Sequence, residues 1–215
     1  PTVEAIQLFD DFLCELSKRK VQTFIISGNH DSAERMAFGG RLMKESGVYV
    51  APVYAGKTQA VVLEDEWGPI NVYLLPFVKP ANVKRFFEDE QIENYTDAIR
   101  VAVEQMKLNT DERNVLVTHQ FVTGAKRSES EDISVGGTDN VDASVFDEFD
   151  YVALGHIHGP QKIGRETVRY CGTPLKYSFS EIHHKKSVTI VEMKEKGNVE
   201  ICTKELLPLR DWCEM

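Results

Sequence analysis

The sequence YVALGHIHGPQ, at residues 151–161, decides the class of fold that this chain is expected to adopt. Its first four residues are typical of a buried strand, which runs into Gly155 and then into two histidines, His156 and His158. A strand that ends on glycine delivers the next backbone to the carboxyl edge of a sheet, where α/β proteins bind their ligands. If the loop continues extended, alternation puts both imidazoles on one side and Ile157 on the other. The pair is a candidate for metal binding, although two polar loop residues would give the same pattern.

Two further predicted strands are also followed directly by polar side chains. The strand expected at 21–27 ends on Gly28, and the strand expected at 114–118 runs directly into a histidine. Because strand ends lie along one edge of an α/β sheet, residues far apart in sequence can converge there. Imidazole suits zinc, iron and manganese, and an amide oxygen suits harder ions, so a mixed set indicates a first-row divalent metal. The polar residues at the three strand ends are Asn29, His30, His119, His156 and His158.

The rest of the chain predicts an α/β protein with a mixed sheet. Helix, strand, glycine loop and helix alternate in the first fifty residues, and the second half alternates like antiparallel hairpins. A polar stretch at 123–140 predicts a long surface loop. Helices are expected at 2–18, 33–46, 95–108 and 143–148, and the remaining strands at 48–53, 167–171, 187–194 and 199–206, with a hairpin at 59–78.

Composition narrows the class of protein. The 215 residues are 42% hydrophobic and contain no apolar run near the ~20 residues that span a bilayer, so a cytoplasmic protein with no membrane contact is expected. Four scattered cysteines without a Cys-x-x-Cys pair favour reduced thiols. The net charge of -9 argues against binding nucleic acid by electrostatics alone. The chain opens on Pro1 and moves directly into a helical pattern, so we expect a piece of something longer.

Three segments at these strand ends match known motifs. SGNHD at 27–31, VTH at 117–119 and LGHIH at 154–158 resemble the third, fourth and fifth motifs of the calcineurin-like metallophosphoesterases. The flanks GNHDSAER, SVGGTDNVDASVFDEFDYVALGHIHGPQ and RYCGTPLKYSFSE resemble the SbcD-type exonucleases, which are bacterial double-strand-break repair nucleases. The resemblance covers essentially the whole chain. It implies an α/β metallophosphoesterase-like β-sandwich of mixed sheets flanked by helices, here partial because the N-terminal strands are absent.

The resemblance also implies roles for individual residues. His30 would be a catalytic residue that contacts the scissile phosphate and helps to protonate the leaving oxygen, with Asp31 supporting it. The cofactors would be two divalent metal ions, usually manganese in the family. Four residues would bind them: Asn29, His119 and His156 one ion, and His158 the other.

The sequence departs from the family pattern at both ends. The first motif, Asp-x-His, and the second, Gly-Asp-x-x-Asp, have no counterpart, although they supply the bridging aspartate and most ligands of one ion. We therefore expect the chain to hold at best one ion loosely and to be inactive alone. Residues 1–205 are expected to form a partial nuclease domain, and 206–215 to lead into an absent capping domain.

For the full-length protein the resemblance implies a metal-dependent exonuclease and endonuclease that hydrolyses phosphodiesters at DNA ends and hairpins in repair, recombination and replication. Its partners would be DNA, the SMC-like ATPase subunit SbcC, and a second copy bound through helices 2–18 and 33–46. Apolar residues of the second helix could instead belong to the core. Two alternatives stay open: a metallophosphoesterase acting on a small phosphodiester or a phosphoprotein, and a metal-free dimerisation or docking module.

Overall fold

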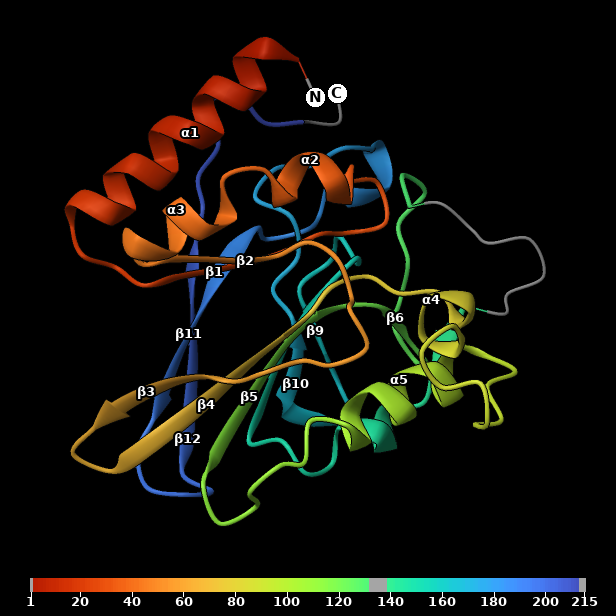
Figure 1. Ribbon diagram of the computed structural model, residues 1–215. Coiled ribbons are helices and arrows are strands. Elements are labelled where there is room, and N and C mark those ends of the chain that lie inside the picture. Colours follow the sequence, from red (N-terminus) through yellow and green to blue (C-terminus); the bar gives the residue numbers. More distant parts are fainter. Residues whose placement is uncertain (1, 132–138, 213–215) are drawn as a thin grey trace.

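A six-stranded mixed sheet forms the body of the protein. The computed structural model describes residues 2–131 and 139–212 (Figure 1). The four central strands of the sheet are parallel, and an antiparallel strand closes each edge. In spatial order the strands are β3 (Val61–Asp65), β4 (Gly68–Leu75), β5 (Arg113–His119), β8 (Tyr151–Gly155), β10 (Arg165–Tyr170) and β9 (Gln161–Ile163).

The central strands and the helix α5 (Tyr95–Glu104) enclose the main core. The side chain of Asn94 caps α5 by accepting a hydrogen bond from the backbone N–H of Asp97. Apolar residues at three- and four-residue spacing then face the sheet, and fully burying one of them, such as Ile99, contributes about 1.5–3 kcal/mol. The largest side chains of this core are Phe146, Phe149 and Tyr170. The core thus fixes β5 and β8, the two strands that end in the candidate site.

Two short sheets lie beside the main one. Strand β1 (Thr23–Ile26) pairs in parallel with β2 (Val48–Ala51), and β11 (Ser187–Met193) forms a hairpin with β12 (Val199–Glu205). A backbone hydrogen bond of 3.0 Å from Phe77 N–H to the Ser27 carbonyl ties the end of β1 to the chain beyond β4. A two-residue pair, β6 (Phe121–Val122) with β7 (Asn140–Val141), follows β5.

The remaining helices flank these sheets. Helices α1 (Val3–Lys18), α2 (Ala33–Ala37) and α3 (Gly40–Glu45) lie on the outer side of β1 and β2, and α4 (Pro80–Lys84) lies near α5 (Figure 1). Two 3-10 turns, η1 (Ala143–Phe146) and η2 (Phe179–Glu181), complete the elements. No helix in the ranges 2–131 and 139–212 is long and apolar enough to cross a membrane.

The expected mixed α/β sheet flanked by helices is confirmed, with four corrections. The single helix at 33–46 is wrong: the chain breaks at Phe38 and Gly39, where Gly39 takes a φ of 77° that ends regular helix. The strand at 165–170 is not part of a simple hairpin run, because it pairs in parallel with β8 as well as antiparallel with β9. Strand β9 was not expected at all.

The fourth correction concerns the sheet edge that should bring the strand ends together. Strand β1 lies outside the six-stranded sheet, so Asn29 reaches the site from a separate sheet. Residues 132–138 of the long loop predicted at 123–140 lie outside the described residues. The metallophosphoesterase-like sandwich and the division at residue 205 stay predictions.

Candidate functional site

Three of the predicted residues meet at one point. The amide oxygen Oδ1 of Asn29 lies 2.9 Å from Nε2 of His119 and 3.3 Å from Nδ1 of His156. The two imidazoles face each other edge to face, with ring centroids 5.2 Å apart. Since these residues are separated by 90 and 127 positions in the chain, only the tertiary fold brings them together.

The register of the sheet and two glycines hold His119 in place. His119 is the last residue of β5 and pairs with Gly155, the last residue of β8. A Cβ atom at Gly155 would lie 2.7 Å from Nδ1 of His119, and one at Gly28 would lie 2.8 Å from Cε1. The ring of Phe77 meets His119 edge to face at 6.2 Å. The imidazole therefore occupies a slot that exists only because both neighbours lack side chains.

Burial keeps the imidazoles of this cluster neutral. Burial, with a smaller contribution from the neighbouring His156, lowers the pKa of His119 from 6.5 to about 4. The pKa of His156 is lowered by burial and then by the positive charge of Arg127. A neutral imidazole keeps a lone pair, which is the form that binds a metal ion.

The donor atoms at this point suit a divalent ion. In the protein alone, both ring nitrogens can donate to the oxygen of Asn29, but the buried Nε2 of His156 then has no hydrogen-bond partner among the described residues. A cation would instead take the lone pairs of two imidazoles and one amide oxygen, a set that matches manganese and similar ions. Within 2–131 and 139–212, no group of three or more His, Cys, Asp or Glu lies close enough to bind a metal. The cluster is thus a partial ligand set.

His158 occupies a different part of the same pocket, whose volume is about 200 Å³. Its Nδ1 lies 3.0 Å from Oε1 of Glu181 and 2.9 Å from the hydroxyl of Ser130. Ile157, between the two histidines, is buried in the core. The loop does not continue extended, because His156 has a φ of 100°, yet both imidazoles line the pocket.

The remaining predicted residues lie at the pocket or beside it. His30 lines the pocket together with Asn29 and His119. The carboxylate of Asp31 accepts a 2.7 Å hydrogen bond from the N–H of Gly28 and so closes the turn that presents Asn29. The catalytic roles assigned to His30 and Asp31 stay predictions.

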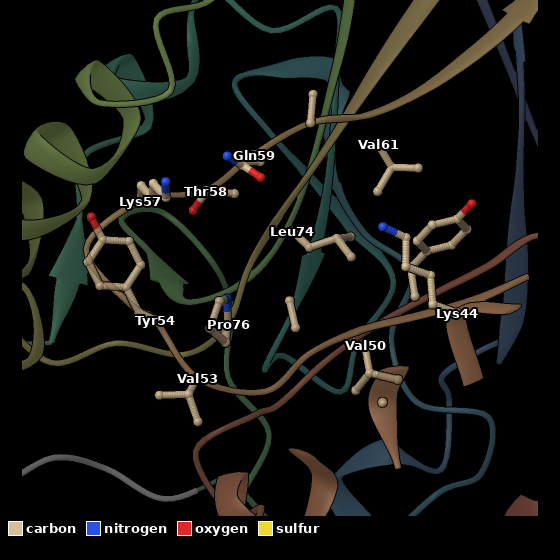
Figure 2. A pocket seen from close by; sticks show the side chains of 14 residues that line it. Lys44, Val50, Val53, Tyr54, Lys57, Thr58, Gln59, Val61, Leu74 and Pro76 are labelled. Atoms are coloured by element: carbon tan, nitrogen blue, oxygen red, sulfur yellow. The ribbon is translucent and has the colours of Figure 1, made fainter. Parts of the chain in front are cut away.

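A second hollow, of about 290 Å³, lies between β2 and the β3–β4 hairpin (Figure 2). Lys44, Tyr54 and Lys57 are among its polar side chains, and Val50, Val61 and Leu74 supply apolar walls (Figure 2). Imidazoles and carboxylates, the side chains that bind metals in proteins, are absent from its lining. This second hollow is therefore not a candidate metal site.

Three residues of the pocket's surroundings were missed by the sequence interpretation: Ser130, Glu181 and Lys186. Ser130 lies in the loop at 123–140, and Glu181 ends the segment RYCGTPLKYSFSE. The sequence interpretation used that segment only as a sign of family resemblance. It was nevertheless the one signal that could have identified Glu181.

The fold and the site define an α/β protein whose polar ligand set lies at the carboxyl ends of its strands. No family model matches the chain. It is 33% identical over 217 aligned positions to the SbcD subunit of the SbcCD nuclease from Staphylococcus epidermidis, covering 98% of this chain and 56% of the relative. It is 34% identical over 214 positions to the corresponding SbcCD nuclease subunit from Staphylococcus saprophyticus, covering 98% and 55%.

The resemblance noted from the motifs is thereby confirmed: over nearly its whole length the chain is similar to SbcD-type nuclease subunits. It spans about half the length of the curated relatives it matches.

Proposed function

We propose that the whole protein is a metal-dependent nuclease, the phosphodiester-hydrolysing subunit of an SbcCD-type complex that acts on DNA ends and hairpins. The observation that carries the proposal is the meeting of Asn29 Oδ1 with the facing nitrogens of His119 and His156. The names of both relatives, which describe a nuclease subunit, support it.

The residues of the pocket would divide the work. Asn29, His119 and His156 would hold one divalent ion, most suitably manganese, and His158 would contribute to a second. Such ions supply charge neutralisation on the phosphoryl oxygens and an activated water. His30, at the pocket wall, would contact the scissile phosphate and donate a proton to the leaving oxygen, and Asp31 would support it through the turn.

The residues of this chain would not suffice for two ions. The family's remaining ligands are carboxylates and a histidine of two motifs that the sequence does not contain. The chain would therefore bind one ion weakly through the three-residue cluster and would not cleave DNA alone. Its net charge of -9 also leaves much of the DNA contact to parts outside this sequence or to a partner.

Two protein partners complete the proposal. The SMC-like ATPase SbcC would be the other component of the complex. A second copy would bind through residues 2–18 and 33–46, since α1 buries only Leu13 and leaves an apolar surface exposed. Its exposed apolar residues are Val3, Ile6, Leu8, Phe9 and Phe12, and Phe38 and Leu42 are exposed in the chain segment 33–46.

Two other functions remain as alternatives. A different phosphoesterase, acting on a small phosphodiester or a phosphoprotein, would use the same pocket. A metal-free docking module would use only the exposed helices. The gene sequence upstream of Pro1 separates the second alternative from the proposal: a nuclease requires Asp-x-His and then Gly-Asp-x-x-Asp there, and their absence from the gene would contradict it.

Manganese binding by the chain itself tests the cluster. Titration followed by electron paramagnetic resonance should give no more than one bound ion, lost in Asn29→Ala and His119→Ala and retained in His30→Ala. His183→Ala, which removes a histidine outside the pocket, is the matched control. In the full-length protein, His30→Ala should abolish manganese-dependent cleavage of duplex ends while metal binding survives. Loss of metal in that variant would show that His30 is misassigned.

A further inference from the structure

A carboxylate with no solvent exposure lies behind His158. Glu181, the last residue of η2, is 0% exposed. Its Oε2 accepts a 2.6 Å hydrogen bond from the ammonium of Lys186, and its Oε1 accepts one of 2.5 Å from the hydroxyl of Ser130. The same Oε1 lies 3.0 Å from Nδ1 of His158. A buried charge is costly unless every polar contact is satisfied, so this arrangement is tightly specified.

The ammonium group of Lys186 makes three hydrogen bonds. The Lys186 side chain is 3% exposed, and its Nζ donates to Glu181, to the backbone carbonyl of His158 at 2.9 Å and to the hydroxyl of Thr173 at 2.9 Å. An ammonium group has three protons, so each has one acceptor. With the ammonium of Lys186 donating to one carboxylate oxygen and the hydroxyl of Ser130 donating to the other, Glu181 acts as a charged acceptor.

These contacts leave one tautomer of His158. The single hydroxyl proton of Ser130 goes to Glu181, so the Ser130 oxygen can only accept from Nδ1 of His158. Oε1 of Glu181 is an ionised acceptor and also requires a proton on Nδ1. With Nδ1–H shared between these two oxygens, the lone pair of the neutral ring resides on Nε2. That nitrogen makes no hydrogen bond to another described residue.

We propose that Glu181, paired with Lys186, is a positioning residue that holds His158 as the Nδ1–H tautomer and presents the Nε2 lone pair as a ligand for a divalent cation in the pocket. A carboxylate behind a metal-binding histidine fixes both ring orientation and tautomer. The identity of the ligand rests on the proposed function, whereas the tautomer does not. The proposal gives a role to the YSFSE segment, which the sequence marked and the function left unused.

The tautomer can be measured directly without any metal. Protonated and lone-pair imidazole nitrogens have well-separated nitrogen-15 chemical shifts, and the signal of His158 can be assigned by its loss in His158→Gln. At a pH of about 8, where an ordinary imidazole is neutral, the protein should show a protonated Nδ1 and a bare Nε2 at His158. The opposite tautomer in the unmodified protein would overturn the proposal, whatever the variants do.

Glu181→Gln provides a sharper test, because the geometry predicts that this substitution reverses the tautomer of His158. The ammonium of Lys186 attracts the amide oxygen, so the amide NH₂ turns toward Nδ1 of His158 and demands a lone pair there. The ring should then switch to the Nε2–H tautomer. Adding Lys186→Met removes the orienting charge, lets the amide oxygen face Nδ1, and should restore the original tautomer.

A matched control separates positioning from general destabilisation. Asp65→Asn removes the carboxylate partner of another buried cation, Arg113, which begins β5 at the end opposite His119. His158 should keep its tautomer in this variant. An unchanged tautomer in Glu181→Gln, or an inversion in Asp65→Asn, would overturn the proposal. Failure to bind manganese would count against the proposed function alone, because the tautomer is read without metal.

Discussion

Gly155 is the position where one added methyl group tests how the site is built. Its backbone φ is not positive, so alanine meets no conformational penalty there, but the new Cβ would lie 2.7 Å from Nδ1 of His119. Reaching an ordinary contact of 3.4 Å needs a shift of about 0.7 Å. The His119 ring has little room to move, because Asn29 hydrogen-bonds its other nitrogen at 2.9 Å and the rings of Phe77 and His119 pack edge to face. Overpacking of this kind costs about 1–3 kcal/mol.

A double-mutant cycle measures that cost as a contact with His119. We expect Gly155→Ala to lower the free energy of unfolding by about 1–3 kcal/mol in urea denaturation, and to lower Tm by roughly 2–4 °C for each kcal/mol. In a His119→Ala background the same substitution should cost little, since the clashing ring is gone. Gly40→Ala, at the first position of α3 and with open space around the new Cβ, should be neutral or stabilising. An equal cost of Gly155→Ala in both backgrounds would refute the reasoning.

Three further perturbations test other parts of the molecule. Tyr170→Phe removes a buried hydroxyl that donates to one backbone carbonyl and accepts from one backbone N–H, and urea denaturation should show a loss of about 1–3 kcal/mol. Hydrogen bonds from Arg113 hold the pKa of Asp65 below 3.8, so the stabilisation from this ion pair is present above that pH and is lost as the pH falls. Calorimetry should therefore show a lower Tm for Asp65→Asn at neutral pH. The Tm of this variant should also decline less steeply in acid than that of the parent protein. Phe12→Glu should convert a dimer to a monomer in analytical ultracentrifugation, and a monomeric parent protein would contradict dimerisation through α1.

The two strands that end in the site could be predicted from the sequence, because their composition is typical of buried strands. NVLVT and YVAL are short apolar runs followed by histidine or glycine, and both form parallel strands with one face buried and the other at least partly buried. Strand β9 has only three residues, Gln161–Ile163, too few for a pattern to emerge. The break at 38–39 had a signal, since Gly39 and Gly40 are consecutive, but apolar periodicity continues across it.

Only part of the site could be predicted from the sequence. The strand ends predicted which imidazoles and amide could meet, but the pairing of His119 with Gly155 is a matter of register, which hydrophobic pattern does not specify to one residue. The contact of Glu181 with Ser130 spans 51 residues between two irregular segments. Nothing local indicates that such residues will be neighbours, because only the tertiary fold brings the two segments together.

The φ of 100° at His156 sets stability and function against each other at a single residue. A non-glycine residue in that region stores about 1–3 kcal/mol of backbone strain, which glycine would release. Any redesign of this protein guided by folding energy alone would therefore favour glycine at 156 and delete a side chain of the three-residue cluster. The position is one where a thermostability screen and a binding screen should select opposite sequences.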